Sequence, residues 1–540
     1  MLRASAAFLV ATLLAVSAWP RAPAPAPAGA EVLYRQGILP SGAPLRGERE
    51  GADPVEGAAA ACVNCHRRSG FGTEEGRIVI PPITGKYLFR AGSMDAANMA
   101  NPGGEAAGPR RSRYTEQSLA RAIRAGVDPD GRTLDYLMPR FPLDDAAMAM
   151  LIAYLKQLST HPVRGADGDT LQFATIVTPD ADPVKRQGML DVLEHFFGNK
   201  NAFHLGKDPP LQSDRRIHFR VVRRWQLQVW ELSGPPESWE AQLEQRFKAQ
   251  PVFAVISGIG GRTWEPVHRF CQSESIPCLL PNIDLPVVAE QDFYPVYFSR
   301  GVLLEADVIA RRMHEEAEKS GLRRVIQVYR REDIGAPAAR ALAAAVAPLG
   351  VKAVARELKS TNPARELADL LRETAAGDAL VLWLRPGDLQ ALPAQPAANT
   401  SVFVSGLMGG LENAPLPAAW RTSHMTYPYQ LPPQRTVSMN YPLGWFNIQH
   451  IPVVDERTQT NTYIACSILA EAAGHMLDNF VPDYLLERVE VELSHRIING
   501  YYPRLGLAPG QRFGSKGAYI VHFADPQGKR VVADGDWIVP

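Results

Sequence analysis

The amino-acid sequence predicts a multidomain protein, with an all-α domain at about residues 31–160 followed by a two-lobed α/β domain at residues 171–540. Three observations support this division. The chain of 540 residues is too long for one compact core. Helical periodicity and loop residues dominate before residue 160. Beyond a polar linker at residues 161–170, apolar segments of strand length alternate with helical segments, as in parallel sheets covered by helices.

The first 30 residues are typical of a secretory signal peptide followed by an extended spacer. Arg3 provides a positive start, and the largely apolar segment 6–16 is shorter than the ~20 residues that span a bilayer as a helix. Cleavage is expected after Ala18 or Ala30, and residues 20–30 are almost all Pro and Ala. An uncleaved membrane anchor is the alternative. We expect a periplasmic protein with no membrane span after cleavage.

Composition narrows the classes of partner. Lys and Arg together number 57, and so do Asp and Glu, so no net charge favours nucleic acid or an anionic membrane. Hydrophobic residues make up 46% of the chain, which is ordinary for a soluble globular protein. Five cysteines in 540 residues exclude a disulfide framework.

The segment Cys62-Val63-Asn64-Cys65-His66 carries the strongest signal of function. Two thiols three residues apart can add to the two vinyl groups of one haem, and the adjacent imidazole then binds the iron. A zinc site would need a second Cys or His pair nearby, and a redox dithiol would need a preceding strand. We therefore predict one covalently bound haem c, held by Cys62 and Cys65, with His66 as an axial ligand.

Met138 is the predicted second axial ligand. It follows a sharp turn at residues 128–132 and precedes a helix that begins near Asp144 or Asp145. A thioether at this position would close the iron to small ligands and raise its potential. Met94 and Met99 are competing thioethers in a polar loop.

These features together resemble class I cytochromes c. The resemblance covers residues 62–158 and comprises the CxxCH motif, Pro81-Pro82-Ile83-Thr84-Gly85, a helix begun by Tyr114-Thr115, the Gly131-Arg132 turn, Met138-Pro139-Arg140 and a terminal Ala153-Tyr154-Leu155 helix. It implies that the carbonyl of Pro82 accepts the Nδ1 proton of His66, and a purely loop-forming role is the alternative for Pro82. Arg110, Arg111 and Arg113 lie in an insert. Their side chains could pair with the haem propionates, contact a partner protein or remain in solvent.

The second domain is predicted from alternating periodicities. Strands are expected at residues 171–177, 217–222, 252–257, 324–329, 379–384 and 401–405. Helices are expected at residues 183–197, 236–249, 263–275, 302–320, 336–349 and 363–375. A terminal hairpin is expected from residues 518–523 and 529–532.

This pattern is similar to the type I periplasmic binding proteins, the branched-chain amino-acid receptor group. The similarity lies in Val252-Phe253-Ala254-Val255-Ile256-Ser257-Gly258, Ser275-Ile276-Pro277-Cys278 and Arg324 to Tyr329 with Asp333-Ile334-Gly335. It implies a cleft between lobes at the carboxyl ends of the strands. The expected cleft residues are Ser257, the backbone of Gly258, Gly260 and Gly261, which would offer N–H groups to an anion, and Tyr329 with Arg330. A tight turn that binds no ligand is the alternative for the glycine stretch, because Thr263 stands where a full GxGxxG motif has its last Gly.

The remaining three cysteines are predicted to have structural roles. Cys271 and Cys278 lie at the end of a predicted helix and the start of the next strand, so a disulfide is favoured over two buried thiols in an oxidising compartment. Cys466 is expected in the core. No spacing typical of a catalytic nucleophile or a catalytic metal is found in the C-terminal part of the sequence.

The leading hypothesis is a periplasmic electron carrier rather than an enzyme, with a receptor-like domain that recognises a partner or a solute. A dehydrogenase and a terminal acceptor are the expected redox partners. The alternative is an ABC-transporter-type substrate-binding protein whose haem senses or gates binding of a small molecule. A haem enzyme such as a peroxidase is disfavoured, because two axial ligands leave no open iron site.

Overall fold

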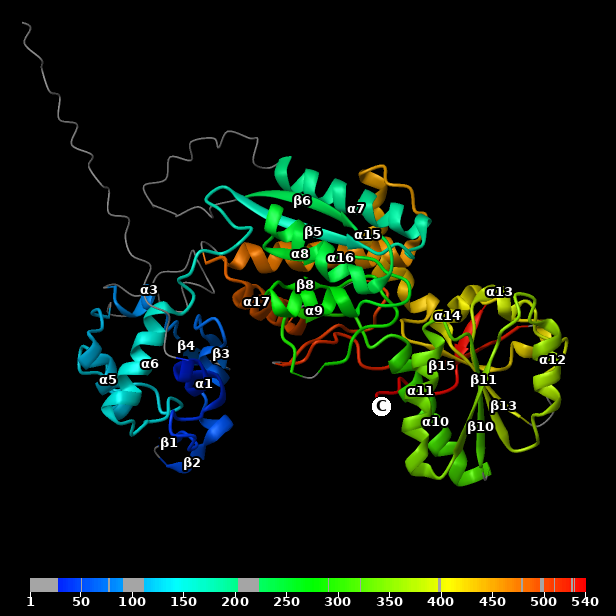
Figure 1. The fold of residues 1–540 in the computed structure, drawn as a ribbon, viewed down its shortest axis with the longest axis horizontal. Coiled ribbons are helices and arrows are strands. Elements are labelled where there is room, and N and C mark those ends of the chain that lie inside the picture. Colours follow the sequence, from blue (N-terminus) through cyan, green and yellow to red (C-terminus); the bar gives the residue numbers. More distant parts are fainter. Residues whose placement is uncertain are drawn as a thin grey trace, which may run out of the picture. The chain divides into compact units, whose positions relative to one another are not determined.

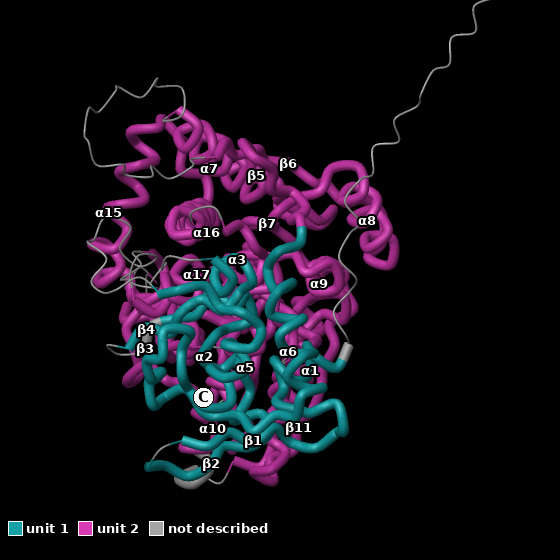
Figure 2. The backbone as a smooth tube through the Cα atoms, turned by 90° about the vertical axis from the view of Figure 1, so that its left-hand side faces the viewer, with its two compact units in different colours: residues 1–98, 105–161 teal, residues 99–104, 162–540 magenta. Residues whose placement is uncertain are grey.

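The structure is a computed structural model that describes residues 28–49, 51–75, 78–90, 111–202, 223–289, 291–320, 322–396, 400–476, 479–495, 500–508, 510–525, 528 and 530–540. The chain divides into two compact units (Figure 2), residues 1–98 with 105–161 and residues 162–540 with 99–104. The signal segment, Met94, Met99, Arg110 and the strand expected at residues 217–222 lie outside the described residues. No helix among the described residues is long and apolar enough to cross a membrane.

The first unit is mainly helical but also contains two antiparallel strand pairs. Its helices are α1 (Ala28–Gln36), η1 (Gly57–Ala60), α2 (Val63–His66), α3 (Gly85–Leu88), α5 (Glu116–Ala125) and α6 (Asp145–Gln157). Its strands are β1 (Arg46–Arg49), β2 (Ala52–Glu56), β3 (Thr73–Glu75) and β4 (Ile78–Ile80), paired β1–β2 and β3–β4. The all-α prediction was therefore wrong in this respect, because a turn at Gly51, with φ of 73°, allows a local hairpin.

The two longer helices after the CxxCH motif, α5 and α6, begin where their capping residues predict. Thr115 caps α5 by accepting a hydrogen bond from the Ser118 N–H, and Asp144 caps α6 by accepting one from the Ala147 N–H. The buried face of α6 carries Met148, Leu151, Ile152 and Leu155. This face packs in one cluster with residues of α1 and α5, so the helices surround a single core.

The second unit has two sheets, one in each lobe (Figure 1). The first lobe has the parallel order β6-β5-β7-β8-β9, from β5 (Thr170–Val177), β6 (Arg224–Glu231), β7 (Ala254–Ile256), β8 (Cys278–Leu279) and β9 (Pro295–Val296). Its helices from the same stretch of chain are α7 (Pro183–Ala202), η2 (Pro236–Ser238), α8 (Trp239–Ala249) and α9 (Glu265–Ser273). Three later helices, α15 (Pro432–Ile448), α16 (Glu456–His475) and α17 (Pro482–His495), also belong to this lobe, as the packing of α16 on α7 shows.

The second lobe has the order β11-β10-β12-β13-β14-β15-β16. Its strands are β10 (Arg324–Tyr329), β11 (Lys352–Glu357), β12 (Asp378–Trp383), β13 (Ser401–Val404), β14 (His424–Tyr427), β15 (Tyr519–Phe523) and β16 (Val531–Ala533). Its helices are α10 (Val302–Ser320), α11 (Gly335–Val346), η3 (Ala347–Leu349), α12 (Ala364–Arg372), α13 (Pro386–Leu389), α14 (Gly406–Gly409), η4 (Leu411–Asn413) and η5 (Ala418–Trp420). The strands from β11 to β14 are parallel, whereas β15 and β16 add antiparallel.

Most of the longer buried strands were predicted, but the buried strand β14 was missed, as was the exposed strand β11. β10 and α10 have the expected bounds, and the C-terminal hairpin is confirmed as β15 and β16. β11 was not predicted, because this edge strand is largely exposed and lacks an apolar run.

Glu305 of α10 is a buried carboxyl group inside the second lobe. It accepts hydrogen bonds from the hydroxyl of Ser405, from Thr426 Oγ1 at 2.6 Å and from the Leu407 N–H at 2.9 Å. Burial raises the pKa of Glu305 to about 7, although these three hydrogen bonds oppose the rise. The folded state therefore keeps a proton that the unfolded state releases near pH 4.5.

Because the folded state binds more protons in this window, the free energy of unfolding should fall as pH rises from about 4.5 to about 7. The Glu305→Gln variant should lose most of this dependence, which amounts to about 3 kcal/mol. Thermal unfolding followed by circular dichroism across this pH range measures it. The matched control Glu315→Gln, on a partly exposed position of the same helix, should keep the wild-type profile. An unchanged profile in Glu305→Gln contradicts the assignment.

Candidate functional site

The CxxCH motif forms a single helical turn in the first unit. Cys65 and His66 lie on α2, and Cys62 precedes it, with its carbonyl accepting hydrogen bonds from the His66 N–H at 2.9 Å and the Cys65 N–H at 3.3 Å. Both cysteines are half-buried, reduced thiols. A separation of three residues on a helix places both thiols on one face. Burial raises the pKa of the Cys62 thiol to about 12, so this thiol is protonated at neutral pH.

The imidazole of His66 is buried and is oriented by one hydrogen bond. Nδ1 lies 3.1 Å from the carbonyl oxygen of Pro81, and the side chain is 8% exposed. Burial lowers the pKa of His66 to about 4, although the Pro81 carbonyl opposes this shift. The ring is therefore neutral near pH 7. With Nδ1 as the donor, Nε2 has no hydrogen-bond partner among the described residues and is the nitrogen available to a metal.

The expected role of Pro82 was wrong by one residue, since the carbonyl that meets His66 belongs to Pro81. β4 ends at Ile80, directly before the two prolines, and a residue that precedes a proline, as Pro81 does, favours an extended backbone. Successive carbonyls of an extended chain point to opposite sides, so only one of the two neighbouring prolines can face the ring. Pro82 instead is buried, while Pro81 is exposed.

Met138 lies in the loop between α5 and α6 and is partly buried. It packs on the same hydrophobic cluster as Cys62, Val63 and Ile83. The predicted turn before it is present, because the Asp128 carboxylate accepts hydrogen bonds from the N–H groups of Asp130 and Arg132 at 2.9 and 2.8 Å. The thioether and the CxxCH turn thus belong to one apolar environment. Two thiols, one neutral imidazole and one thioether are a donor set that fits a covalently bound haem c.

The loop that carries Met138 is held by a strand from before the haem motif. The Arg140 guanidinium donates hydrogen bonds to the carbonyls of Met138 and, at 3.2 Å, Leu134. The backbone of Arg140 exchanges hydrogen bonds of 2.7 and 2.9 Å with Glu48 of β1. An added Cβ on Gly47 would lie 2.9 Å from the side chains of both Pro139 and Phe141. Sequence reasoning missed β1, because no local pattern reports a pairing with a segment so distant in the chain.

Arg111, in the insert before α5, forms its contacts within this unit. Its guanidinium donates to the Tyr87 carbonyl at 2.9 Å and to the Ser112 carbonyl at 2.6 Å, and it stacks on the Tyr114 ring at 4.4 Å. These contacts fix the start of α5. They also occupy the Arg111 guanidinium, so neither a haem propionate nor a partner protein is needed to explain its position.

In the second unit, Ser257 was expected to face the cleft, and this expectation was wrong. The residue is fully buried at the end of β7. Its hydroxyl donates to Thr462 Oγ1 of α16 at 3.0 Å and accepts from Asn282 Nδ2 at 3.0 Å. Ser257 therefore joins the sheet to α16 inside the first lobe. The sequence could not show this, because α16 returns to this lobe from far along the chain.

Two N–H groups at the end of the glycine loop already have an acceptor within the chain. Those of Gly261 and Arg262 donate to the Asp180 carboxylate at 3.3 and 2.8 Å. Gly258 packs too closely for a side chain, since an added Cβ would lie 2.5 Å from the Trp264 ring. An added Cβ on Gly260 would lie 3.1 Å from the same ring. The loop expected to bind an external anion thus binds a carboxylate of the chain itself.

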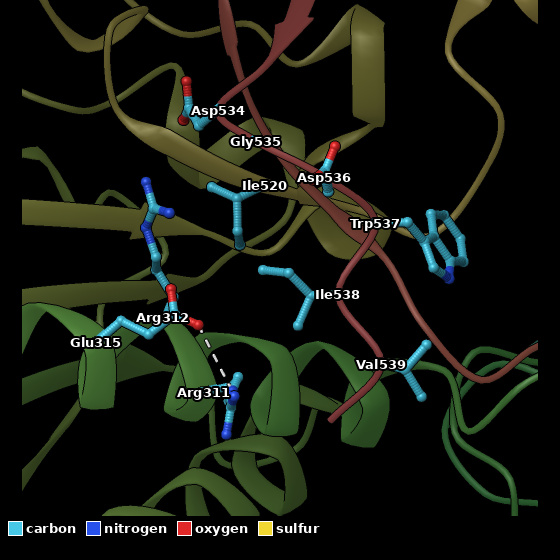
Figure 3. Close-up of a pocket in the computed structure, with 10 residues that line it drawn as sticks. All are labelled: Arg311, Arg312, Glu315, Ile520, Asp534, Gly535, Asp536, Trp537, Ile538 and Val539. Atoms are coloured by element: carbon cyan, nitrogen blue, oxygen red, sulfur yellow. Dashed lines mark ion pairs between the residues drawn. The ribbon is translucent and has the colours of Figure 1, made fainter.

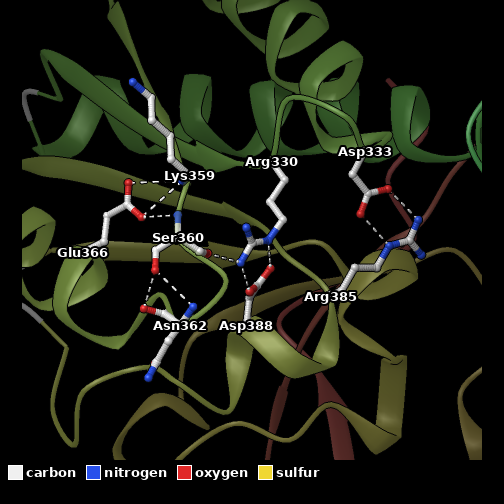
Figure 4. Close-up of polar contacts among 8 residues, drawn as sticks. All are labelled: Arg330, Asp333, Lys359, Ser360, Asn362, Glu366, Arg385 and Asp388. Atoms are coloured by element: carbon white, nitrogen blue, oxygen red, sulfur yellow. Dashed lines mark hydrogen bonds and ion pairs between the residues drawn. The ribbon is translucent and has the colours of Figure 1, made fainter.

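The carboxyl ends of the second lobe's strands carry paired charges (Figure 4). Tyr329 ends β10 half-buried, and its carbonyl accepts the Leu358 N–H at 2.9 Å. The next residue, Arg330, holds Asp388 with two hydrogen bonds of 2.8 and 2.6 Å. Arg385 holds Asp333 with two of 2.8 Å. Burial alone would raise the pKa of Asp333, but the hydrogen bonds and charge of Arg385 hold it below its ordinary value.

Two cavities lie in the second lobe, and one of them is beside these strand ends. One, of about 320 Å³, lies between α10 and the residues after β16 (Figure 3) and is lined by Arg311, Arg312, Ile520 and Trp537 among others. Another, of about 660 Å³, adjoins β11 and α12. The predicted site residues line neither of these two cavities.

The disulfide expected between Cys271 and Cys278 is not formed in the structure. Both residues are buried, reduced thiols that share a hydrogen bond, and burial raises the pKa of Cys271 well above its ordinary value. The close approach agrees with the expectation, but the structure has a thiol pair in place of the bond. Cys466 is fully buried on α16, which confirms its place in the core.

The role of β1 can be tested without any measurement of activity. Gly47→Ala should destabilise the first unit by about 1–3 kcal/mol, because the added methyl group overlaps Pro139 and Phe141. The amides of Glu48 and Arg140 should then exchange hydrogen faster, as read by peptide-resolved mass spectrometry. Gly29→Ala is the control, since its Cβ would meet nothing closer than 3.6 Å. Equal exchange in both variants argues against a clamp by β1.

Comparisons with known proteins agree with this division of the chain. Residues 56–159 match the family model of cytochrome c. A branched chain amino acid ABC transporter protein from Thermus thermophilus, solved with bound valine, is similar at 12% identity, covering 69% of this chain and 97% of that one, with a TM-score of 0.51. A fatty acid ABC transporter substrate-binding protein from Thermomonospora curvata has 14% identity, coverage of 70% and 95% and a TM-score of 0.49. No curated protein matches the sequence. The chain thus joins a cytochrome c domain to a unit with the fold of the type I periplasmic binding proteins.

Proposed function

We propose that this protein is a periplasmic electron carrier with a single covalently attached haem c, and that its receptor-like unit recognises a redox partner. The observation that carries the proposal is His66. Its ring is buried and neutral, Nδ1 is fixed by Pro81, and Nε2 is left for a metal, all on the helical turn that presents Cys62 and Cys65. A bound haem c would supply a reversible one-electron couple.

The chain's own residues set the character of this site. Cys62 and Cys65 would form the two thioether links, and His66 Nε2 and the Met138 thioether would bind the iron. Arg140 and β1 keep the Met138 loop in place through the contacts described above. Two side-chain ligands leave no open coordination position, which favours electron exchange over catalysis at the iron.

The receptor-like unit is proposed to bind a protein partner rather than a small anionic solute. At the strand ends where ligands bind in such folds, Asp180 occupies the glycine loop, and Arg330 and Arg385 are each held by a carboxylate. A dehydrogenase that supplies electrons and an acceptor that takes them are the partners implied by a soluble carrier. Export by the N-terminal segment would place all of them in the periplasm.

The alternative is a solute receptor whose haem senses or gates binding. The fold shared with a protein solved with valine favours it. Titration of amino acids against the oxidised and the reduced protein distinguishes the two functions, because a coupled receptor must show different affinities in the two states. Equal or negligible binding in both states removes the sensing function.

Replacement of Met138 tests the axial ligand. Met138→Leu should remove the thioether-to-iron absorption band in the red and lower the reduction potential, because the thioether stabilises the reduced iron. Met150→Leu is the matched control, since Met150 packs on the same cluster and is not expected to be a ligand. An unchanged band in Met138→Leu would show that another residue is the ligand.

The covalent link is tested by mass and colour. Protein made with a working c-type maturation system should carry the mass of one haem that denaturation and solvent extraction do not remove. Cys62→Ala with Cys65→Ala should abolish this added mass, whereas Cys466→Ala, which changes a core thiol, should keep it. A colourless wild-type protein with the mass of the bare polypeptide would falsify the proposed function.

A further inference from the structure

We propose that Asp180 is a built-in carboxylate that fills the anion-binding loop of the first lobe and thereby excludes small carboxylates, such as free amino acids, from the receptor-like unit. The inference concerns the second unit alone. It does not depend on haem attachment, so it can fail while the electron-carrier proposal stands, and the reverse also holds.

Asp180 lies just after β5, and both of its carboxylate oxygens are in use. Oδ1 accepts hydrogen bonds from Thr178 Oγ1 at 2.5 Å and from the Gly261 N–H at 3.3 Å. Oδ2 accepts the Arg262 N–H at 2.8 Å, and Arg262 Nε lies 3.7 Å away. The side chain is 24% exposed, so it stands at the edge of the lobe rather than in its core.

The loop that receives Asp180 has the features of an anion site. Two successive N–H groups, of Gly261 and Arg262, converge on one carboxylate a few residues before α9, where the helix dipole adds a positive potential. Gly261 permits the approach, because an added Cβ would lie 2.7 Å from the Asp180 carbonyl oxygen and 2.8 Å from Oδ2. The loop is therefore shaped around the chain's own carboxylate.

Neighbouring cationic groups are satisfied in the same way. Arg330 binds Asp388, Arg385 binds Asp333, and Arg457 binds Asp284 at 2.9 Å. An incoming carboxylate would have to displace a carboxylate of the chain at each of these positions. Such a displacement would leave a partly buried acid without its partner, which is costly.

Binding of acetate and of L-leucine to the full-length holoprotein, measured by calorimetry, tests the proposal. The wild type should show no saturable binding. Asp180→Ala frees the two N–H groups and should bind both compounds at least ~10-fold more tightly than the wild type. Asp180→Asn, which keeps an acceptor oxygen in the loop, should bind neither. Glu265→Ala removes a nearby exposed acid and should behave as the wild type.

Two outcomes overturn the proposal. One is wild-type protein that binds L-leucine as tightly as Asp180→Ala does, and the other is a folded Asp180→Ala variant that binds neither compound. If Asp180→Ala does not fold, hydrogen exchange of the wild type decides. The amides of Gly261 and Arg262 should be protected, and acetate should not change that protection. Rapid exchange, or protection gained only with acetate, contradicts a loop filled by Asp180.

Discussion

The hydrogen bond from His66 Nδ1 to the Pro81 carbonyl is the interaction on which the first unit's function depends. It selects one tautomer of a buried, neutral imidazole and directs the other nitrogen away from the protein's own acceptors. The same turn carries both thiols, so attachment and ligation share one rigid element. The core around α6 packs against both Cys62 and Met138, and β1 holds the Met138 loop through its hydrogen bonds with Arg140.

A different feature characterises the second unit: charged groups at the strand ends are paired with other groups of the same chain. In the first lobe a carboxylate meets backbone N–H groups, and in the second lobe carboxylates meet planar guanidinium groups. Arg262 of the first lobe also contributes to lowering the pKa of Asp333 in the second. A fold shared with solute receptors is thus combined with strand ends that already hold their counter-ions.

Features that depend on neighbouring residues could be predicted from the sequence, whereas contacts between distant segments could not. The CxxCH turn, the caps at Thr115 and Asp144 and the turn at Asp128 depend on neighbouring residues, and all of these are present in the structure. The choice of Pro81 over Pro82 depends on how the chain leaves β4, which no spacing encodes. Ser257 was assigned to the cleft because the sequence does not show that α16 covers it. Asp180 was missed for the same reason, since its partners lie 81 and 82 positions away.

The way β15 completes the second sheet has a consequence for the order of assembly. This strand comes from residues 519–523, yet it pairs with β14 beside strands formed much earlier in the chain. The first lobe likewise includes α16 and α17, which come late in the chain. Neither lobe can close from a contiguous stretch, whereas the haem-motif unit is complete by residue 161. The first unit can therefore acquire its native packing while the receptor-like unit is still an open chain, so maturation of the two units is separated in time.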